Sequence, residues 1–368
     1  MNNIDFKKLG DYVKIKTGKL DANASSEDGE YPFFTCSIEP LKISSYSYDC
    51  ECCLVAGNGD LNVKYYNGKF DAYQRTYIIE SLDKEKLDVM YLYFFLSSYI
   101  EVLRKQSIGG VIKYIKLGNL TDALIPIPEL SKQKEICQNL IKAKKILSSN
   151  ENLLSKYDTL IKSRFIEMFG DEPVENRKWK VEKLGNLGLC KNGMNFSYED
   201  NGFEINCLGV GDFKDNAVIS NCEKLPVISL NEKPSEEYLL KDNDIVFVRS
   251  NGNKELVGRS VLVHPRVLTT FSGFCIRFRL STDSINHLFL LQFLKMPNTR
   301  KNMAGRGANI QNLNQQILSN LDIPVPPISL QNDFASFVQQ IDKSKFAVQK
   351  SLEKAETLYK SLMQEYFG

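Results

Sequence analysis

The sequence has few of the residues that enzymes most often use for proton transfer. Its only two histidines, His264 and His287, are far apart in the chain, which leaves poor prospects for histidine-based acid–base catalysis. No P-loop is present, and Gly209-Val210-Gly211-Asp212 lacks the third glycine of a dinucleotide-binding turn. A DNA amino-methyltransferase needs an Asn/Asp-Pro-Pro-aromatic loop to hold a flipped base. Pro324-Val325-Pro326-Pro327 lacks both the acid or amide and the aromatic residue of that loop. We therefore assign no catalytic residue, no metal ligand and no cofactor.

Long apolar runs and a strong excess of one charge are also missing. No run approaches the roughly 18 apolar residues that cross a bilayer, and the longest candidate, Tyr91 to Ile100, reads as a buried helix. The segment Met1 to Phe6 lacks the basic and apolar parts of a secretory signal, so we expect a cytoplasmic protein. A net charge of +2 is too small for binding to nucleic acid by bulk charge, so any such surface must be local.

The cysteines do not form a recognisable framework. There are nine, an odd number. Cys50 and Cys53 form a formal C-x-x-C, but no second pair of this kind exists in the sequence. A zinc site is the weaker hypothesis, and reduced cysteines partly buried in strands are the better one.

What the sequence does contain is one segment that occurs twice. Residues 125–170 and 323–368 align without a gap at a constant offset of 198, from Ile125 and Ile323 to Gly170 and Gly368. Gln133 matches Gln331, and Phe169-Gly170 matches Phe367-Gly368. A repeat of this length means that one structural unit is built twice, so the chain is read as two related halves.

Both copies show the 4-3 spacing of apolar residues that is typical of a heptad repeat. At 1.5 Å per residue, about five heptads make a helix roughly 55–60 Å long, which needs a partner for its apolar stripe. The simplest partner is the other copy, although two unrelated amphipathic helices on separate domains remain an alternative. Asn150, Arg164 and Lys345 interrupt the stripe and can fix its register. The predicted coiled-coil core comprises Ile136, Leu140, Leu147, Leu154, Ile161, Val338, Ile341, Val348, Leu352 and Tyr359.

The halves also begin alike, which sets the domain boundaries. Phe6-Lys7-Lys8-Leu9-Gly10-Asp11 resembles the stretch from Trp179 to Asn186 at an offset of 175. We predict a first variable domain at 1–125, a first helical spacer at 126–170, a second variable domain at 171–323 with a linker at 171–178, and a second spacer at 324–368. The prolines of Ile125-Pro126-Ile127-Pro128 and Ile323-Pro324-Val325-Pro326 favour extended chain before each helix.

The variable domains are expected to be mixed α/β. Apolar and β-branched runs predict strands at 54–56, 63–70, 76–79, 244–249, 260–263 and 274–280, and the first domain is expected to turn at Asn67-Gly68. One mixed helix is expected near 86–103 and another near 285–294. Each domain then ends in a glycine-bearing loop, at 109–115 and 305–311.

In this order, the motifs resemble the specificity (S) subunit of Type I restriction–modification systems. The resemblance rests on the Ile-Pro-x-Pro segments, the two glutamines that follow them, the heptad helices that end in Phe-Gly, and the restart at Trp179-Lys180 and Lys183-Leu184-Gly185. Asp244 to Gly252 also looks like a target-recognition motif of the family. In the first half, Ala56-Gly57-Asn58-Gly59 stands where the second half has Arg-Ser before its turn.

The resemblance implies an α/β fold with two target-recognition domains separated by two long helices. The helices would form an intramolecular antiparallel coiled coil, which gives a pseudo-two-fold, circular organisation. Each domain would read one half of a split double-stranded DNA target, and the helices would set the spacing between the halves. Two modification (methyltransferase) subunits would dock on the chain, restriction subunits could join them, and the chain itself would perform no chemistry.

Base edges are read mostly by arginine, lysine, asparagine and glutamine, and phosphates by further cations. The loops of both domains carry such side chains beside glycines, which let backbone approach a phosphate closely. Each one could equally be an ordinary solvated loop residue. The candidate DNA-binding residues are Asn58, Lys64, Arg75, Lys113, Tyr114, Arg249, Asn251, Lys254, Arg259, Arg306, Asn309 and Gln311.

Two other functions are weighed against DNA reading. A decoy or scaffold with the same fold would bind methyltransferase subunits without reading DNA, and a gel shift with the partner subunits present would separate the two. A nuclease or methyltransferase is disfavoured by the missing motifs, and methyl transfer by the purified chain alone would establish it.

Overall fold

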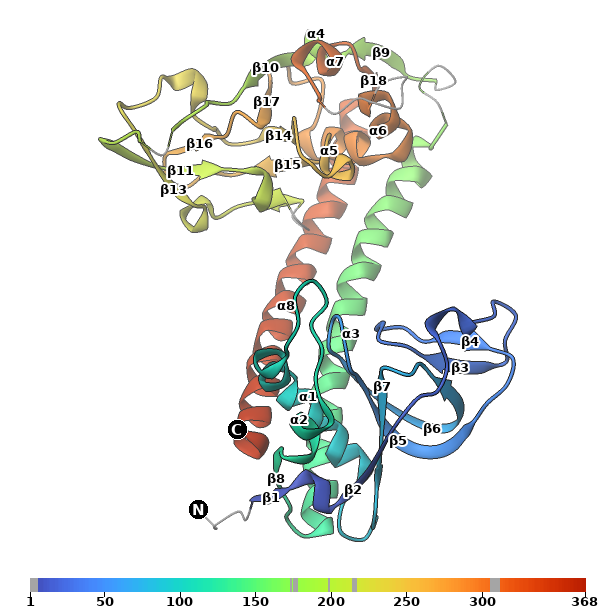
Figure 1. Ribbon diagram of the computed structural model, residues 1–368. Helices are drawn as coiled ribbons and strands as arrows, with labels where there is room; N and C mark the ends of the chain where they lie inside the picture. The colour runs from blue at the N-terminus through green and yellow to red at the C-terminus, as the bar shows by residue number, and fades with distance from the viewer. Residues whose placement is uncertain (1–5, 173, 175–177, 198, 214–216, 305–311) are drawn as a thin grey trace. The chain divides into compact units, whose positions relative to one another are not determined.

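The computed structural model describes residues 6–172, 174, 178–197, 199–213, 217–304 and 312–368. The chain forms two compact units (Figure 1). Unit 1 combines residues 1–152 with 348–368, and unit 2 comprises residues 153–347. Each unit contains a sheet-bearing domain and parts of two long helices, α3 (Leu130–Phe169) and α8 (Ile328–Phe367). Within the described ranges, no helix is both long and apolar enough to cross a membrane.

The domain of unit 1 is built around a six-stranded sheet with the order β2-β7-β5-β6-β3-β4. A separate two-stranded sheet pairs β1 with β8. The elements are β1 (Phe6–Lys8), β2 (Val13–Thr17), β3 (Tyr31–Phe34), β4 (Leu41–Ile43), β5 (Tyr48–Ala56), β6 (Val63–Ala72), β7 (Thr76–Ser81), α1 (Val89–Gln106), α2 (Leu117–Thr121) and β8 (Leu124–Pro126).

The central strand β5 has apolar residues on both faces, because successive side chains of a strand point to opposite sides. Cys53 and Val55 join a core that includes α1. Cys52 and Leu54 join a second cluster with Phe34 and Phe70. Cys50 and Cys53, three positions apart on this strand, therefore point to opposite faces, and among the described residues no group of three or more potential metal ligands occurs.

The predicted turn at Asn67-Gly68 is wrong. Strand β6 runs straight through both residues, and Asn67 and Gly68 pair with Glu51 and Cys50 of β5. Gly68 has a φ of 136°, which glycine adopts without steric cost. The pairing with the long strand β5 outweighs the local preference of this dipeptide for a turn.

The domain of unit 2 has a five-stranded sheet, β10-β17-β14-β15-β12, a three-stranded sheet, β13-β11-β16, and the pair β18-β9. The elements are β9 (Lys180–Lys183), α4 (Leu184–Leu187), β10 (Gly188–Asn192), β11 (Phe203–Leu208), β12 (Val218–Ile219), β13 (Val227–Leu230), β14 (Asp244–Val248), β15 (Ser260–Val263), β16 (Thr269–Phe271), β17 (Cys275–Leu280), α5 (His287–Lys295), α6 (Pro297–Ala304), α7 (Gln315–Ser319) and β18 (Asp322–Val325).

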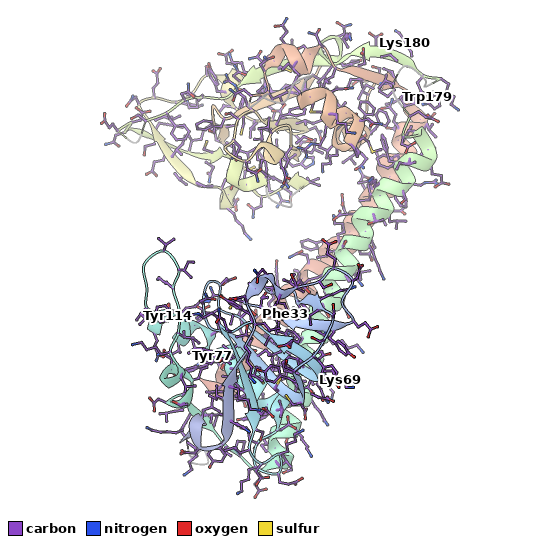
Figure 2. The ribbon with its side chains drawn as sticks, turned by 45° about the vertical axis from the view of Figure 1, so that its right-hand side comes forward. Phe33, Lys69, Tyr77, Tyr114, Trp179 and Lys180 are labelled. Atoms are coloured by element: carbon purple, nitrogen blue, oxygen red, sulfur yellow. The ribbon has the colours of Figure 1, made fainter. Side chains whose placement is uncertain are left out.

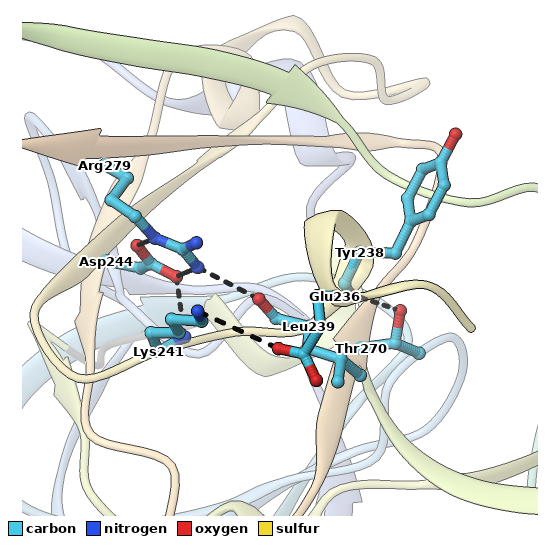
Figure 3. A network of polar contacts seen from close by, with 7 residues as sticks. All are labelled: Glu236, Tyr238, Leu239, Lys241, Asp244, Thr270 and Arg279. Atoms are coloured by element: carbon cyan, nitrogen blue, oxygen red, sulfur yellow. Dashed lines mark hydrogen bonds and ion pairs between the residues drawn. The ribbon is translucent and has the colours of Figure 1, made fainter. Parts of the chain in front are cut away.

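A polar network anchors the start of β14 (Figure 3). The carboxylate of Asp244, which is 1% exposed, accepts hydrogen bonds at 2.7 Å from both Nε and Nη2 of Arg279. It also accepts one at 2.7 Å from the backbone N–H of Lys241. Arg279 donates further to the carbonyl of Leu239 at 3.0 Å. A bidentate pair of this kind restricts geometry as well as pairing charge. The first residue of β14 is therefore held in a fixed position.

The two domains begin in the same way. Lys7 lies opposite Ile125 in the β1–β8 pair, and Glu182 lies opposite Ile323 in the β9–β18 pair. These registers reproduce the sequence offsets of 175 and 198. The proline-containing segments are therefore extended, as predicted, and they end before the long helices begin.

Within each unit the two long helices run antiparallel. In unit 1, Asn139 near the start of α3 donates to the hydroxyl of Tyr366 near the end of α8 at 3.4 Å. In unit 2, Phe169 at the end of α3 packs edge-to-face against Phe334 near the start of α8, with ring centroids 5.8 Å apart. The chain's last helix therefore ends in the unit that contains its first domain, which is the expected circular organisation (Figure 1).

The predicted heptad positions lie on the inward side of the helices. The buried positions are Ile136, Leu140, Ile161, Val338 and Leu352, and the half-buried ones are Leu147, Leu154, Ile341, Val348 and Tyr359.

Two polar residues of the seam bond across it. Asn150 donates to the hydroxyl of Ser351 at 3.1 Å, and Lys345 forms an ion pair with Asp158 at 2.6 Å. The third, Arg164, pairs with Glu167 of its own helix at 2.8 Å, and its guanidinium lies 6.0 Å from the ring centroid of Phe337 on α8. All three polar seam positions therefore contact the other helix, as residues that fix register are expected to do.

Candidate nucleic-acid interface

Three loops of unit 1 meet at one end of its sheet. The N–H of Gly57 donates to the carbonyl of Arg75 at 2.8 Å, and the N–H of Ile115 donates to the carbonyl of Gly57 at 2.9 Å. Asn58 lies opposite Tyr114 in an isolated bridge. The turn after β5, the turn after β6 and the loop after α1 are thereby joined by backbone bonds. The structure brings together Asn58, Arg75, Lys113 and Tyr114, which the sequence places in three separate segments.

Glycine is required at position 57 for this junction. A Cβ there would lie 2.3 Å from the carbonyl oxygen of Arg75 and 3.0 Å from the ring of Tyr77. Tyr77 in turn donates its hydroxyl to the carbonyl of Ile115 at 3.2 Å. The close packing of backbone on backbone leaves the side chains of Arg75 and Lys113 exposed to solvent. Figure 2 shows Tyr77 and Tyr114 in the same part of the domain.

Lys64 lies nearby but is less available. It stands on β6, where it donates to Oδ1 of Asn62 and is half-buried. Burial lowers the pKa of its ammonium below the usual value, and the nearby Cys36 and Glu39 oppose that shift. Asn62 also donates to the carbonyl of Cys36 at 2.8 Å. Lys64 is therefore held by the protein, whereas Arg75 and Lys113 extend from it.

Sequence reasoning missed Arg104, which supports the first of these loops. Its guanidinium donates to the carbonyl of Leu61 at 3.0 Å and pairs with Asp60 at 2.8 Å. A basic residue in the last turn of a helix is a common pattern, and nothing in the sequence indicates which loop it reaches.

In unit 2 the turn after β14 is held in the same way as the turn after β5 in unit 1. The N–H of Arg249 donates to the carbonyl of Phe274 at 2.8 Å, and the N–H of Leu313 donates to the carbonyl of Arg249 at 2.8 Å. Ser250 lies opposite Asn312 in an isolated bridge. Gly57 and Arg249 therefore occupy equivalent positions, with the same pair of backbone bonds. The first half thus has Gly57-Asn58 where the second has Arg249-Ser250, and the backbone bonds of the turn are the same in both.

The following residues form a tight polar turn. Oδ1 of Asn251 accepts from the N–H of Asn253 at 2.8 Å, and Oδ1 of Asn253 accepts from the N–H of Glu255 at 3.0 Å. Such turns, made by asparagine side chains, hold a loop without regular structure. Arg259 leads into β15, where its carbonyl accepts from the N–H of Val248 at 2.9 Å.

The remaining predicted residues of the second domain are Lys254, Arg306, Asn309 and Gln311. Lys254 lies in a short 3-10 turn, Lys254–Leu256. Arg306, Asn309 and Gln311 lie outside the described residues. The described chain resumes at Asn312, directly beside Ser250. Of the second set, the structure therefore brings together Arg249, Asn251 and Arg259 around one turn.

Each unit thus presents guanidinium, amide and, in unit 1, ammonium groups on loops held by backbone bonds. These groups are donors suited to base edges and phosphates. In the described part of the chain, no group of three or more histidine, cysteine or acidic residues could hold a metal ion. The arrangement can bind an extended polyanion.

Comparisons with known proteins agree with this geometry. The sequence model of the family "Type I restriction modification DNA specificity domain" matches residues 1–156 and 176–356. The Type I restriction enzyme EcoDI specificity subunit of Escherichia coli is 27% identical over 397 aligned positions, which cover 99% of this chain and 88% of that protein.

Two solved structures share the fold along the whole chain. The S subunit of a Type I restriction–modification system from M. genitalium has a TM-score of 0.65 at 17% identity and covers 100% of this chain and 97% of its own. A chain from a study of complex assembly in the type I R-M system has a TM-score of 0.56 at 15% identity and covers 99% and 97%. With the family match over most of its length, this chain belongs to the family of Type I restriction–modification specificity subunits, the non-catalytic components that provide DNA recognition.

Proposed function

We propose that each sheet-bearing domain reads one half of a bipartite double-stranded DNA target, residues 1–125 reading one half and residues 171–323 the other. The observation that carries this proposal is the equivalence of Gly57 and Arg249. Each is held by the same two backbone bonds, at 2.8 and 2.9 Å in the first domain and 2.8 and 2.8 Å in the second. The same rigid turn therefore carries different side chains in the two domains, which suits two readers with different targets.

The spacers, residues 126–170 and 324–368, set the distance between the two half-sites in this proposal. A helix rises about 1.5 Å per residue, so its length converts directly into a distance along DNA. The bonds across the seam, from Asn150 to Ser351 and from Lys345 to Asp158, oppose sliding of one helix along the other.

The same helices dock two modification (methyltransferase) subunits, and restriction subunits can join the complex. Both helices carry exposed aliphatic or aromatic residues, namely Ile141, Ile146, Leu153, Leu160, Phe346 and Leu358. Leu160 and Leu358 are equivalent in the repeat. Because two similar surfaces suit two identical partners, a repeated apolar position supports two docking sites. The complex works in the cytoplasm, where its DNA lies.

Methylome sequencing tests the proposal. Cells that express this chain with its modification subunits should carry methylation at a bipartite sequence with a gap of fixed length, and cells with the modification subunits alone should not. Methylation without a bipartite motif would contradict it. The decoy alternative, which the comparisons do not support, predicts no added methylation and no gel shift of DNA by the assembled complex.

A further inference from the structure

The loop after α1 in unit 1 has an apolar tip that is fully exposed. Val111 is 105% exposed relative to the reference state and Ile112 is 62% exposed. Single exposed apolar residues are ordinary, but two adjacent β-branched residues at the end of a projecting loop form a contiguous apolar contact surface. In Figure 2 this loop projects from the domain above the labelled Tyr114.

The loop is built to present this tip. Ile108 and Tyr114 exchange two backbone hydrogen bonds, at 3.0 and 2.9 Å, which close a narrow stem. Gly109 has a φ of 120°, and a Cβ there would lie 2.6 Å from the carbonyl oxygen of Ile112. The stem is fastened to the turn after β5, because the N–H of Gly59 donates to the carbonyl of Lys113 at 3.0 Å. Position 109 has a backbone conformation that favours glycine, and backbone hydrogen bonds hold both the stem and its junction with the turn after β5. The loop therefore has a defined conformation.

The surroundings of the tip are cationic. Arg75, Lys105, Lys113 and Lys116 are all exposed around the stem, while the nearby Asp60 is already paired with Arg104 at 2.8 Å. An apolar tip on a loop whose stem and adjoining segments carry exposed cations fits a partner with a polyanionic rim and an apolar feature inside. A DNA groove has phosphates along its edges, and in the major groove thymine alone presents a methyl group.

We propose that Val111 and Ile112 enter the major groove and read thymine through its C5-methyl group. This inference rests on the proposed function and adds a specificity determinant to it. Valine and isoleucine are short and stiff at χ1, so their methyl groups are held at a fixed place relative to the stem. Asn58, across the bridge from Tyr114, lies at the base of the same stem, and an asparagine is suited to the adenine edge of an A·T pair.

The second domain differs in sequence. Residues 305–311, where the sequence predicts the equivalent loop and which lie outside the described residues, read Gly-Arg-Gly-Ala-Asn-Ile-Gln, with polar or charged residues between the apolar ones. A thymine methyl contact of this kind is therefore assigned to the half-site of the first domain only.

Thymine-to-deoxyuridine replacement tests the proposal, since it removes one methyl group and leaves the base pair intact. The assembled complex of this chain with its modification subunits is measured on duplexes of the target found by methylome sequencing, with each thymine replaced in turn. Loss of one buried methyl, about 0.8 kcal/mol, corresponds to about fourfold weaker binding. We expect this loss at one or more positions of the first half-site in the wild-type complex.

The double variant Val111→Ser/Ile112→Ser should bind the unmodified target roughly tenfold more weakly and should lose its sensitivity to deoxyuridine. Leu82→Ser is the matched control, because Leu82 is 60% exposed but follows β7 at the end of that strand far from Arg75. It should behave as wild type. A double variant with wild-type affinity, or a wild-type complex insensitive to deoxyuridine throughout the first half-site, would overturn the proposal.

Two further results are informative. If the double variant binds more weakly but keeps its sensitivity to deoxyuridine, the tip contacts DNA by another means and the methyl reading is wrong. If the wild-type complex selects no bipartite target at all, the proposed function itself fails, and that result is visible before any variant is made.

Discussion

Gln133 and Gln331 stand 198 positions apart and make the same three hydrogen bonds. Oε1 of Gln133 accepts from the N–H of Asp88 at 2.9 Å, and its Nε2 donates to the carbonyls of Lys86 and Pro128, both at 2.8 Å. Gln331 repeats these bonds with Asn286 at 2.8 Å, Ser284 at 3.0 Å and Pro326 at 2.7 Å. Both glutamines are fully buried. Each one ties the start of a spacer helix to the N-cap of its domain's helix, so domain and spacer form one unit.

The first prediction concerns these glutamines. Gln133→Ala and Gln331→Ala should each lower the free energy of unfolding by roughly 2–4 kcal/mol, because each leaves buried backbone groups without partners. Urea unfolding measures the change. Gln138→Ala and Gln339→Ala, at exposed positions of the same helices, are the matched controls and should change it by less than about 0.5 kcal/mol. If the buried and the exposed glutamine variants changed the free energy of unfolding equally, the buried glutamines would not be joining the domains to the helices.

The second prediction concerns the ion pair at the base of β14. Asp244→Ala leaves the guanidinium of Arg279 without its partner in a largely buried place, so a loss of roughly 3 kcal/mol is expected. The double variant Asp244→Leu/Arg279→Met should recover part of that loss, since two apolar residues need no pairing. A double variant less stable than Asp244→Ala, measured in urea, would count against this explanation.

The third prediction is a dependence on pH from Lys295. Burial and the neighbouring ammonium of Lys345 lower the pKa of Lys295 from 10.5 to about 8, and the carboxylates of Asp158 and Asp342 oppose the shift. Between about pH 8 and 10.5 the unfolded chain then binds more protons than the folded one. The free energy of unfolding contributed by this group therefore rises with pH across that window, by up to about 1.4 kcal/mol per unit.

Comparison with Lys295→Met isolates this group from the cysteines and tyrosines that titrate in the same range. At pH 7 the variant should be more stable than wild type, because it buries no charge. The difference should shrink steadily as the pH rises from 8 towards 10.5. A difference that stays constant across this window in urea unfolding would show that Lys295 keeps its ordinary pKa.

The fourth prediction concerns spacer length. Inserting one helical turn at facing positions of α3 and α8 adds about 6 Å, which at 3.4 Å per base step is roughly 1 to 2 base pairs. The methylated target should keep both half-sites and gain that many base pairs between them. An unchanged gap in the methylome would mean that the helices do not set the distance.

The repeated parts of this fold, and strands such as β7, β14 and β15, could be predicted from the sequence. The heptad pattern and the offset of 198 indicate two long helices, because the same apolar pattern in both copies indicates the same structure in both. The extended segments before them follow from the fixed φ of proline. Gln133 and Gln331 were visible as a match, but two of the three bonding partners of each lie 45 and 47 residues away along the chain and have no local signal.

The loops were less predictable, because their geometry depends on long-range contacts. Asn67-Gly68 favours a turn locally, yet it lies inside β6 because β5 pairs along the whole segment. The meeting of Gly57, Arg75 and Ile115 joins three segments through single backbone bonds. No pattern within any one of those segments indicates the other two. The candidate DNA contacts themselves remain predictions.

The central claim, that each domain reads its own half-site, is tested most directly by methylome sequencing of two variants side by side. In Asn58→Ala/Arg75→Ala the substitutions lie in the first domain, and in Arg249→Ala the substitution lies in the second. The account predicts that each variant relaxes or changes the bases of one half-site and leaves the other half-site and the gap as in wild type. Variants that alter both halves together, or the same half, would contradict it.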